Sequence, residues 1–74
     1  MNTSGLIEVD PEKLGGTPVF LGTRVPVQNF FDYLEGGEGL EVFLDDFPTV
    51  ERRQALALLE LMRAKVIGEY EIAA

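Results

Sequence analysis

Glycine and proline constrain the fold more than any other feature of the sequence, because they divide the chain into two unlike parts. In residues 6–27, turn signals at Asp10-Pro11 and at Gly15-Gly16-Thr17-Pro18 leave room only for short apolar runs, which are typical of strands. In residues 27–68, such breaks are few and apolar residues recur at helical spacing. We therefore predict a mainly α fold, in which an N-terminal β ribbon is followed by three helices.

The length of the chain limits the size of its core. With 74 residues it allows one domain, covering residues 1–74. It contains no cysteine and no histidine, so disulfides and imidazole metal sites cannot reinforce that core. The same absences remove the commonest nucleophile–base pairs and the commonest general base near neutral pH. We therefore expect no enzyme activity, no catalytic residue, no metal and no cofactor, and we expect self-association or a partner to add stability.

The predicted ribbon is too small to be stable alone. Its apolar runs lie at residues 6–9 and 19–25, and Gly22 interrupts the second run, which indicates a small hairpin. Two or three short strands need helices or another chain to pack against. Two leucines of the third predicted helix also lie beside its core stripe. We therefore predict a homodimer, whose candidate interface residues are Ile7, Val9, Val19, Leu56 and Leu61.

Two of the predicted helices share the apolar spacing i, i+3, i+4, i+7. The first begins at Val27, with Pro26 expected at its first helical position, and Gly36-Gly37 ends it. The second begins at Leu40, and Pro48 ends it. The apolar residues at this spacing are Val27, Phe30, Phe31 and Leu34 in the first helix, and Leu40, Phe43, Leu44 and Phe47 in the second.

The third predicted helix is the longest. We expect Thr49 to cap its start, the helix to run to about Ile67, and Gly68 to follow its end. A tight turn over residues 46–49 connects it to the second helix. This arrangement is a helix-turn-helix with the third helix in the position of a recognition helix. Its predicted core stripe contains Ala55, Leu58, Leu59, Met62 and Val66.

The charge of the chain is distributed unevenly. The net charge is −7, a sign that repels nucleic acid and anionic membranes. Residues 1–48 hold nine acidic and two basic side chains, whereas residues 49–68 hold four basic and two acidic ones. A surface that binds anions is therefore confined to the third helix and Arg24.

This positive segment supplies the candidate DNA-binding residues, which are Arg52, Arg53, Gln54 and Arg24. The first three occupy the first turn of the third helix, where recognition helices contact base edges. The alternative is that these charges pair within the chain: Arg52 with acids of the second helix, Arg53 with Glu60, and Arg24 with Asp10 or an acid of the first helix. Such a clamp is the favoured interpretation for Arg24.

Acidic side chains dominate the first two predicted helices. They form either a solvated face or a docking surface for a basic partner protein, and Glu41 and Asp45 are the candidate residues of that surface.

The apolar runs are only a few residues long, so no segment is expected to span a membrane. The N-terminal residues Met-Asn-Thr-Ser-Gly lack the basic start and apolar stretch of a signal peptide. The expected location is therefore the cytoplasm.

One segment carries a family resemblance. Residues 7–27 read I-E-V-D-P-E-K-L-G-G-T-P-V-F-L-G-T-R-V-P-V. They resemble the signature of the small bacterial domain of unknown function 433, which has an Asp-Pro step, Gly-Gly-x-Pro-Val and Gly-Thr-Arg-hydrophobic-Pro-Val. The later order of a Gly-Gly break, an acidic helix, Phe47-Pro48 and a last helix also follows the family. The resemblance covers about residues 6–67.

The resemblance implies a homeodomain-like helix-turn-helix preceded by a small β element. It also implies a role, because some members of the family are classed as VapB-type antitoxins beside a PIN-like nuclease toxin. The expected function is thus an antitoxin-like regulatory module that binds such a nuclease, with binding of its own promoter DNA left open. The alternative is a dimeric protein-interaction domain whose helix-turn-helix is structural and binds no DNA.

Overall fold

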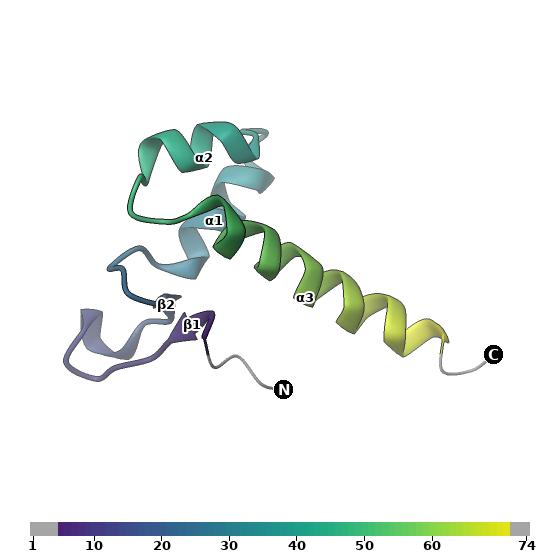
Figure 1. Cartoon of the computed structure of the whole chain (residues 1–74), viewed down its shortest axis with the longest axis horizontal. Helices are drawn as coiled ribbons and strands as arrows, with labels where there is room; N and C mark the ends of the chain where they lie inside the picture. Colours follow the sequence, from purple (N-terminus) through teal and green to yellow (C-terminus); the bar gives the residue numbers. More distant parts are fainter. Residues whose placement is uncertain (1–4, 72–74) are drawn as a thin grey trace.

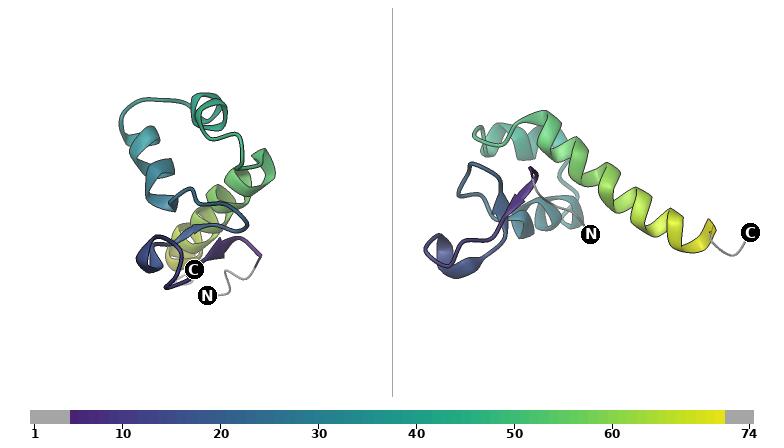
Figure 2. Two further views of the ribbon diagram at one scale, coloured as in Figure 1. Left: turned by 90° about the vertical axis from the view of Figure 1, so that its left-hand side faces the viewer. Right: turned by 60° about the horizontal axis from the view of Figure 1, so that its bottom comes forward.

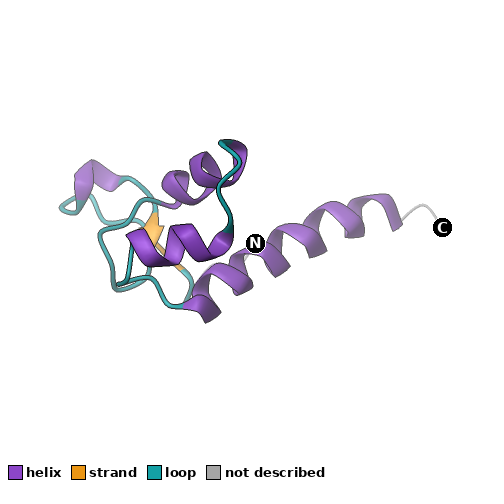
Figure 3. Cartoon of the chain, turned by 90° about the horizontal axis from the view of Figure 1, so that it is seen from above, coloured by secondary structure: helices purple, strands orange, loops and turns teal. Residues whose placement is uncertain are grey.

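The computed structural model describes residues 5–71 of the chain. Their elements follow in the order β1 (Ile7–Glu8), a short helical turn (Leu14–Gly16), β2 (Val19–Phe20), α1 (Val27–Glu35), α2 (Leu40–Asp46) and α3 (Arg52–Glu71) (Figure 1). Helices make up most of the described chain, and the two strands are confined to the N-terminal ribbon (Figure 3). The predicted mainly α class with an N-terminal ribbon is confirmed.

The ribbon is tied together by backbone hydrogen bonds. Strands β1 and β2 are antiparallel, with Ile7 opposite Phe20 and Glu8 opposite Val19. The chain then turns at Gly22, whose φ of 78° favours glycine. After this turn, Val19 forms a single antiparallel bridge with Pro26. The predicted hairpin around Gly22 is therefore present.

Three phenylalanines from three elements form the centre of the core. Phe20 of β2, Phe30 of α1 and Phe43 of α2 are fully buried. Their ring centroids lie 5.1–6.2 Å apart, which is the favourable range for aromatic pairs. Because one of the three rings belongs to the ribbon, the helices provide the packing surface that the short strands lack. The other buried apolar residues are Val19, Val25, Val27, Val50, Ala55 and Leu58.

Helices α1 and α2 lie within one residue of their predicted bounds. Pro26 has φ −61° and ψ 138°, so it caps α1 and is not its first helical residue. Helix α2 ends at Asp46, one residue before Phe47. The hydroxyl of Tyr33 in α1 donates a hydrogen bond to Asp46 Oδ2 at 2.6 Å and joins the two helices at that end.

The predicted start of α3 is wrong. The helix begins at Arg52, and Thr49 lies in the preceding turn. Val50 is only 3% exposed, and its N–H donates to the carbonyl of Phe47 at 3.0 Å. The chain therefore turns once more to bury Val50 before the helix begins. The N-terminal cap is supplied from inside the helix, since Gln54 Oε1 accepts a hydrogen bond from the N–H of Glu51 at 2.9 Å.

The predicted end of α3 is also wrong. The helix continues through Gly68 to Glu71, because Gly68 does not take the positive φ that would stop it. Helix α3 packs on the domain only as far as Met62. Ala55 and Leu58 are buried, but Val66, a predicted core residue, is 53% exposed.

The second half of α3 projects away from the rest of the molecule (Figure 1 and the right-hand view of Figure 2). The radius of gyration is accordingly 13.4 Å, compared with about 11 Å for a compact domain of this length. No helix within the described residues combines the length and apolar character that crossing a bilayer requires.

Candidate functional site

The first turn of α3 is tied to α2 by Arg52. Its guanidinium donates to both carboxylate oxygens of Glu41, with Nη2 lying 2.6 Å from Oε1. The hydrogen bonds from Arg52 hold the pKa of Glu41 below its ordinary value. Both side chains are more than half exposed, so the pair contributes little to stability. It does occupy the bidentate fork of Arg52, and the predicted pairing of Arg52 with an acid of the second helix is confirmed.

The neighbouring residue Arg53 pairs differently from the prediction. Its Nη2 lies 2.7 Å from Oε1 of Glu51, and both side chains are exposed. Glu60 pairs instead with Arg63, at 3.1 Å. Glu51 lies only two residues from Arg53 and shares the start of the helix, so it is the nearer carboxylate.

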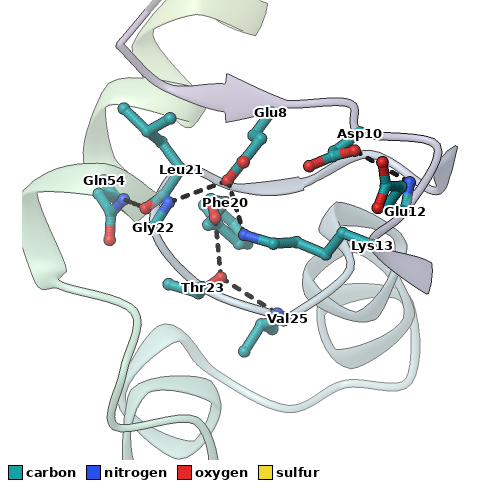
Figure 4. A network of polar contacts seen from close by, with 10 residues as sticks. All are labelled: Glu8, Asp10, Glu12, Lys13, Phe20, Leu21, Gly22, Thr23, Val25 and Gln54. Atoms are coloured by element: carbon teal, nitrogen blue, oxygen red, sulfur yellow. Dashed lines mark hydrogen bonds and ion pairs between the residues drawn. The ribbon is translucent and has the colours of Figure 1, made fainter.

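The third candidate of this turn, Gln54, is buried and serves the fold. It is 6% exposed, and its Nε2 donates to the carbonyl of Leu21 at 3.0 Å while its Oε1 caps the helix. Figure 4 shows this amide between α3 and the hairpin. Because both polar atoms of the amide have partners inside the domain, Gln54 is not placed to read base edges. The hydrogen bond to Leu21 spans 33 residues of sequence and could not be predicted from spacing.

The fourth candidate, Arg24, is exposed at the end of the hairpin and forms no ion pair within residues 5–71. The predicted clamp with Asp10 or an acid of α1 is therefore absent from the described part of the chain. Asp10 instead accepts a hydrogen bond from the N–H of Glu12 at 2.9 Å, within its own turn.

The ribbon holds its own polar network, which the sequence analysis missed (Figure 4). The carboxylate of Glu8 accepts from Lys13 Nζ at 3.0 Å and from the N–H of Gly22 at 3.3 Å. These bonds, led by the one from Lys13, lower the pKa of Glu8. Thr23 Oγ1 donates to the carbonyl of Phe20 at 2.8 Å and accepts from the N–H of Val25 at 3.0 Å. Gly22 and Thr23 of the Gly-Thr-Arg motif thus stabilise the turn.

The predicted interface residues differ in how exposed they are. Val19 is fully buried in the core of its own chain and is not available to another one. Ile7 and Leu61 are partly buried. Val9 and Leu56 are exposed, at 62% and 47%. Of the two predicted acidic docking residues, Asp45 is exposed, and Glu41 is paired with Arg52.

A second apolar face runs along α3. Leu56, Val66 and Tyr70 are 47%, 53% and 80% exposed, and Ile67 beside them is 45% exposed. At 100° per residue these side chains, together with Leu59, share a band centred about 110° from the buried side of the helix. We call this band the outer stripe and define it as Leu56, Leu59, Arg63, Val66 and Tyr70. Four residues of the predicted core stripe, Ala55, Leu58, Leu59 and Met62, pack on the core, so Leu59 borders both faces, and only Val66 was misplaced.

Within residues 5–71 the structure has no pocket and no group of side chains that could hold a metal ion. The outer stripe is therefore the candidate site of the described chain, and its chemistry is apolar contact around one central charge, Arg63.

A family model described as a protein of unknown function, DUF433, matches residues 7–61. The match covers the ribbon, α1, α2 and the first half of α3. No curated protein and no solved structure shows significant similarity to the chain.

Proposed function

We propose that this chain, which belongs to the DUF433 family, is a small regulatory protein of the antitoxin type that acts by binding a partner protein. The observation that carries the proposal is the outer stripe, whose residues Leu56, Val66 and Tyr70 are 47–80% exposed although Leu59 packs partly on the core. The partner class is the one that the family resemblance implies, a PIN-like nuclease toxin.

The energetics of the stripe support protein binding. Burying one Val or Leu side chain contributes about 1.5–3 kcal/mol, and the stripe exposes several apolar side chains at once. The core of this short chain is small, so it contributes little stability to compensate for the exposed apolar side chains. A partner that covers the stripe would stabilise the second half of α3 and gain affinity from the same contacts.

A second candidate is an interaction domain that binds no DNA, in which the helix-turn-helix is structural. The specific observation in its favour is that Arg52 and Arg53 are paired with carboxylates and that Gln54 is buried. The net charge of −7 also opposes binding to a polyanion. We therefore propose promoter binding only for a complex in which the partner protein supplies basic residues. The predicted homodimer is a separate proposal, and its interface would be the ribbon surface around Val9.

Rescue of growth tests the antitoxin proposal. The chain is co-expressed with a PIN-like nuclease encoded beside it, and growth is measured with and without the chain. We expect the wild-type chain to restore growth, Val66→Asp to abolish rescue, and Ala64→Asp, on a different face of the same helix, to preserve it. Failure of the wild-type chain to rescue, at normal expression, would contradict the proposal. Equal loss with Val66→Asp and Ala64→Asp would show that the stripe is not the surface involved.

A further inference from the structure

The spacing of the outer stripe matches one kind of partner surface. Its five residues are separated by 3, 4, 3 and 4 positions from Leu56 to Tyr70, which is the a/d pattern of a heptad repeat. With Ile67 included, the exposed band is about 100° wide at 100° per residue. Within it, the a/d spacing of the five residues is typical of a coiled-coil seam. The occupant that fits this seam is another helix.

The chain's own domain cannot cover the seam. The line of α3 that faces the core begins with Ala55 and Leu58 and continues through Met62. The next residues on that line are Lys65 and Glu69, which are exposed. Charged side chains at these positions end the packing after Met62, and the helix leaves the domain there (Figure 1). The seam therefore projects into solvent along the last turns of α3.

The middle of the seam is charged. Arg63 occupies its central position, and one guanidinium nitrogen lies 3.1 Å from Glu60 at the edge of the seam. Arginine has five N–H donors, so a single hydrogen bond leaves most of them dependent on water. Covering the seam removes that water and leaves Glu60 as the one carboxylate that accepts from Arg63. A partner carboxylate opposite Arg63 would accept from the remaining donors, whereas a partner cation there would be repelled.

A second copy of the chain offers no such carboxylate at its seam positions. In a parallel pair the two Arg63 side chains would occupy the same layer. In an antiparallel pair, where a positions face d positions, Arg63 would lie opposite Val66, and the two guanidinium groups would be about 4.5 Å apart along the axis. No seam position carries an acid in either case. The domains would also repel each other, since residues 5–58 hold ten acidic and four basic side chains.

Building on the proposed function, we infer that the outer stripe of α3 binds a helix of a different protein, which has an apolar a/d seam and an aspartate or glutamate opposite Arg63. The apolar layers supply most of the affinity, and the Arg63–carboxylate pair sets the register and selects the partner.

Two synthetic helical peptides of three heptads test this assignment with the full chain. Both have leucine at the seam positions except the central a position, which is Glu in one peptide and Lys in the other. Binding is measured by fluorescence anisotropy at peptide concentrations below self-association. We expect the Glu peptide to bind on the order of tenfold more tightly than the Lys peptide, and Arg63→Glu to reverse this preference. Ala64→Asp should leave the preference unchanged.

Three results would overturn the assignment: equal binding of the two peptides, binding of neither, or a dimer of the chain alone that Val66→Asp dissociates in sedimentation equilibrium. The outcome is separable from the rescue experiment. Rescue without peptide discrimination would overturn only the Arg63 assignment. Discrimination without rescue would support the assignment and remove the nuclease as the partner. Circular dichroism of each variant shows whether the fold is retained.

Discussion

The two parts of α3, before and after Met62, contain similar proportions of apolar residues, yet the part after Met62 does not pack on the core. In the first half, Ala55 and Leu58 are buried and Gln54 is hydrogen-bonded to the hairpin. In the second half, Val66, Ile67 and Tyr70 are 45–80% exposed. The difference arises because the core-facing side of α3 carries apolar residues up to Met62 and the charged residues Lys65 and Glu69 after it. The first half therefore contributes to the stability of the domain, and the second half is the part that we propose to bind a partner.

The largest contrast should come from truncating one apolar side chain in the core, where the first half of α3 packs, and one in the second half of α3. Phe43→Ala removes a fully buried ring that contacts both Phe20 and Phe30, and should cost about 3–5 kcal/mol. That is comparable with the whole stability of a domain this small, so the variant should be largely unfolded. Val66→Ala, on an exposed site, should change stability by less than about 0.5 kcal/mol. Urea denaturation followed by circular dichroism measures both. A large loss with Val66→Ala would mean that the second half of α3 packs on the domain after all.

Replacing glycine should change stability by smaller amounts, with a loss in the hairpin and a gain at the end of α3. Gly22 in the hairpin has a φ of 78°, so Gly22→Ala should destabilise the chain by about 1–2 kcal/mol. Gly68 is helical, and a Cβ built on it meets nothing within 4 Å. Gly68→Ala should therefore strengthen the end of α3 locally, by up to about 1 kcal/mol, with little change in global unfolding. Hydrogen exchange of the amides of residues 63–71 separates the two effects: only Gly68→Ala should slow that exchange.

The smallest effects should appear in the pH dependence of stability. The pKa of Glu41 is lowered below 4.5 by Arg52, so its contribution is present above pH 4.5 and is lost as the pH falls through the folded value. The pKa of Tyr33 is raised above 10.0 by its hydrogen bond to Asp46. Its contribution is present below pH 10.0 and is lost as the pH rises through the folded value.

Melting temperatures of Glu41→Gln and Tyr33→Phe against pH check this behaviour. Each substitution should flatten one limb of the curve, the acid limb for Glu41→Gln and the alkaline limb for Tyr33→Phe. An acid limb that is unchanged in Glu41→Gln would show that the pair with Arg52 adds nothing to folding in solution.

Local sequence was sufficient to determine the class of the fold, the hairpin at Gly22, and α1 and α2 to within one residue. Each of these depends on turn residues and apolar spacing over fewer than ten positions. Helical spacing also predicted the buried side of α3 at Ala55, Leu58, Leu59 and Met62. The start of α3, the point where its packing ends and the partner of Arg53 depend on contacts that spacing does not specify. Val50 delays the helix because the core has room for it, and Gln54 faces inward because the carbonyl of Leu21 lies there. Helical spacing shows which residues share a face, but only tertiary packing decides how far along the helix that face is covered, and in α3 the packing ends after Met62 and leaves Val66, Ile67 and Tyr70 exposed.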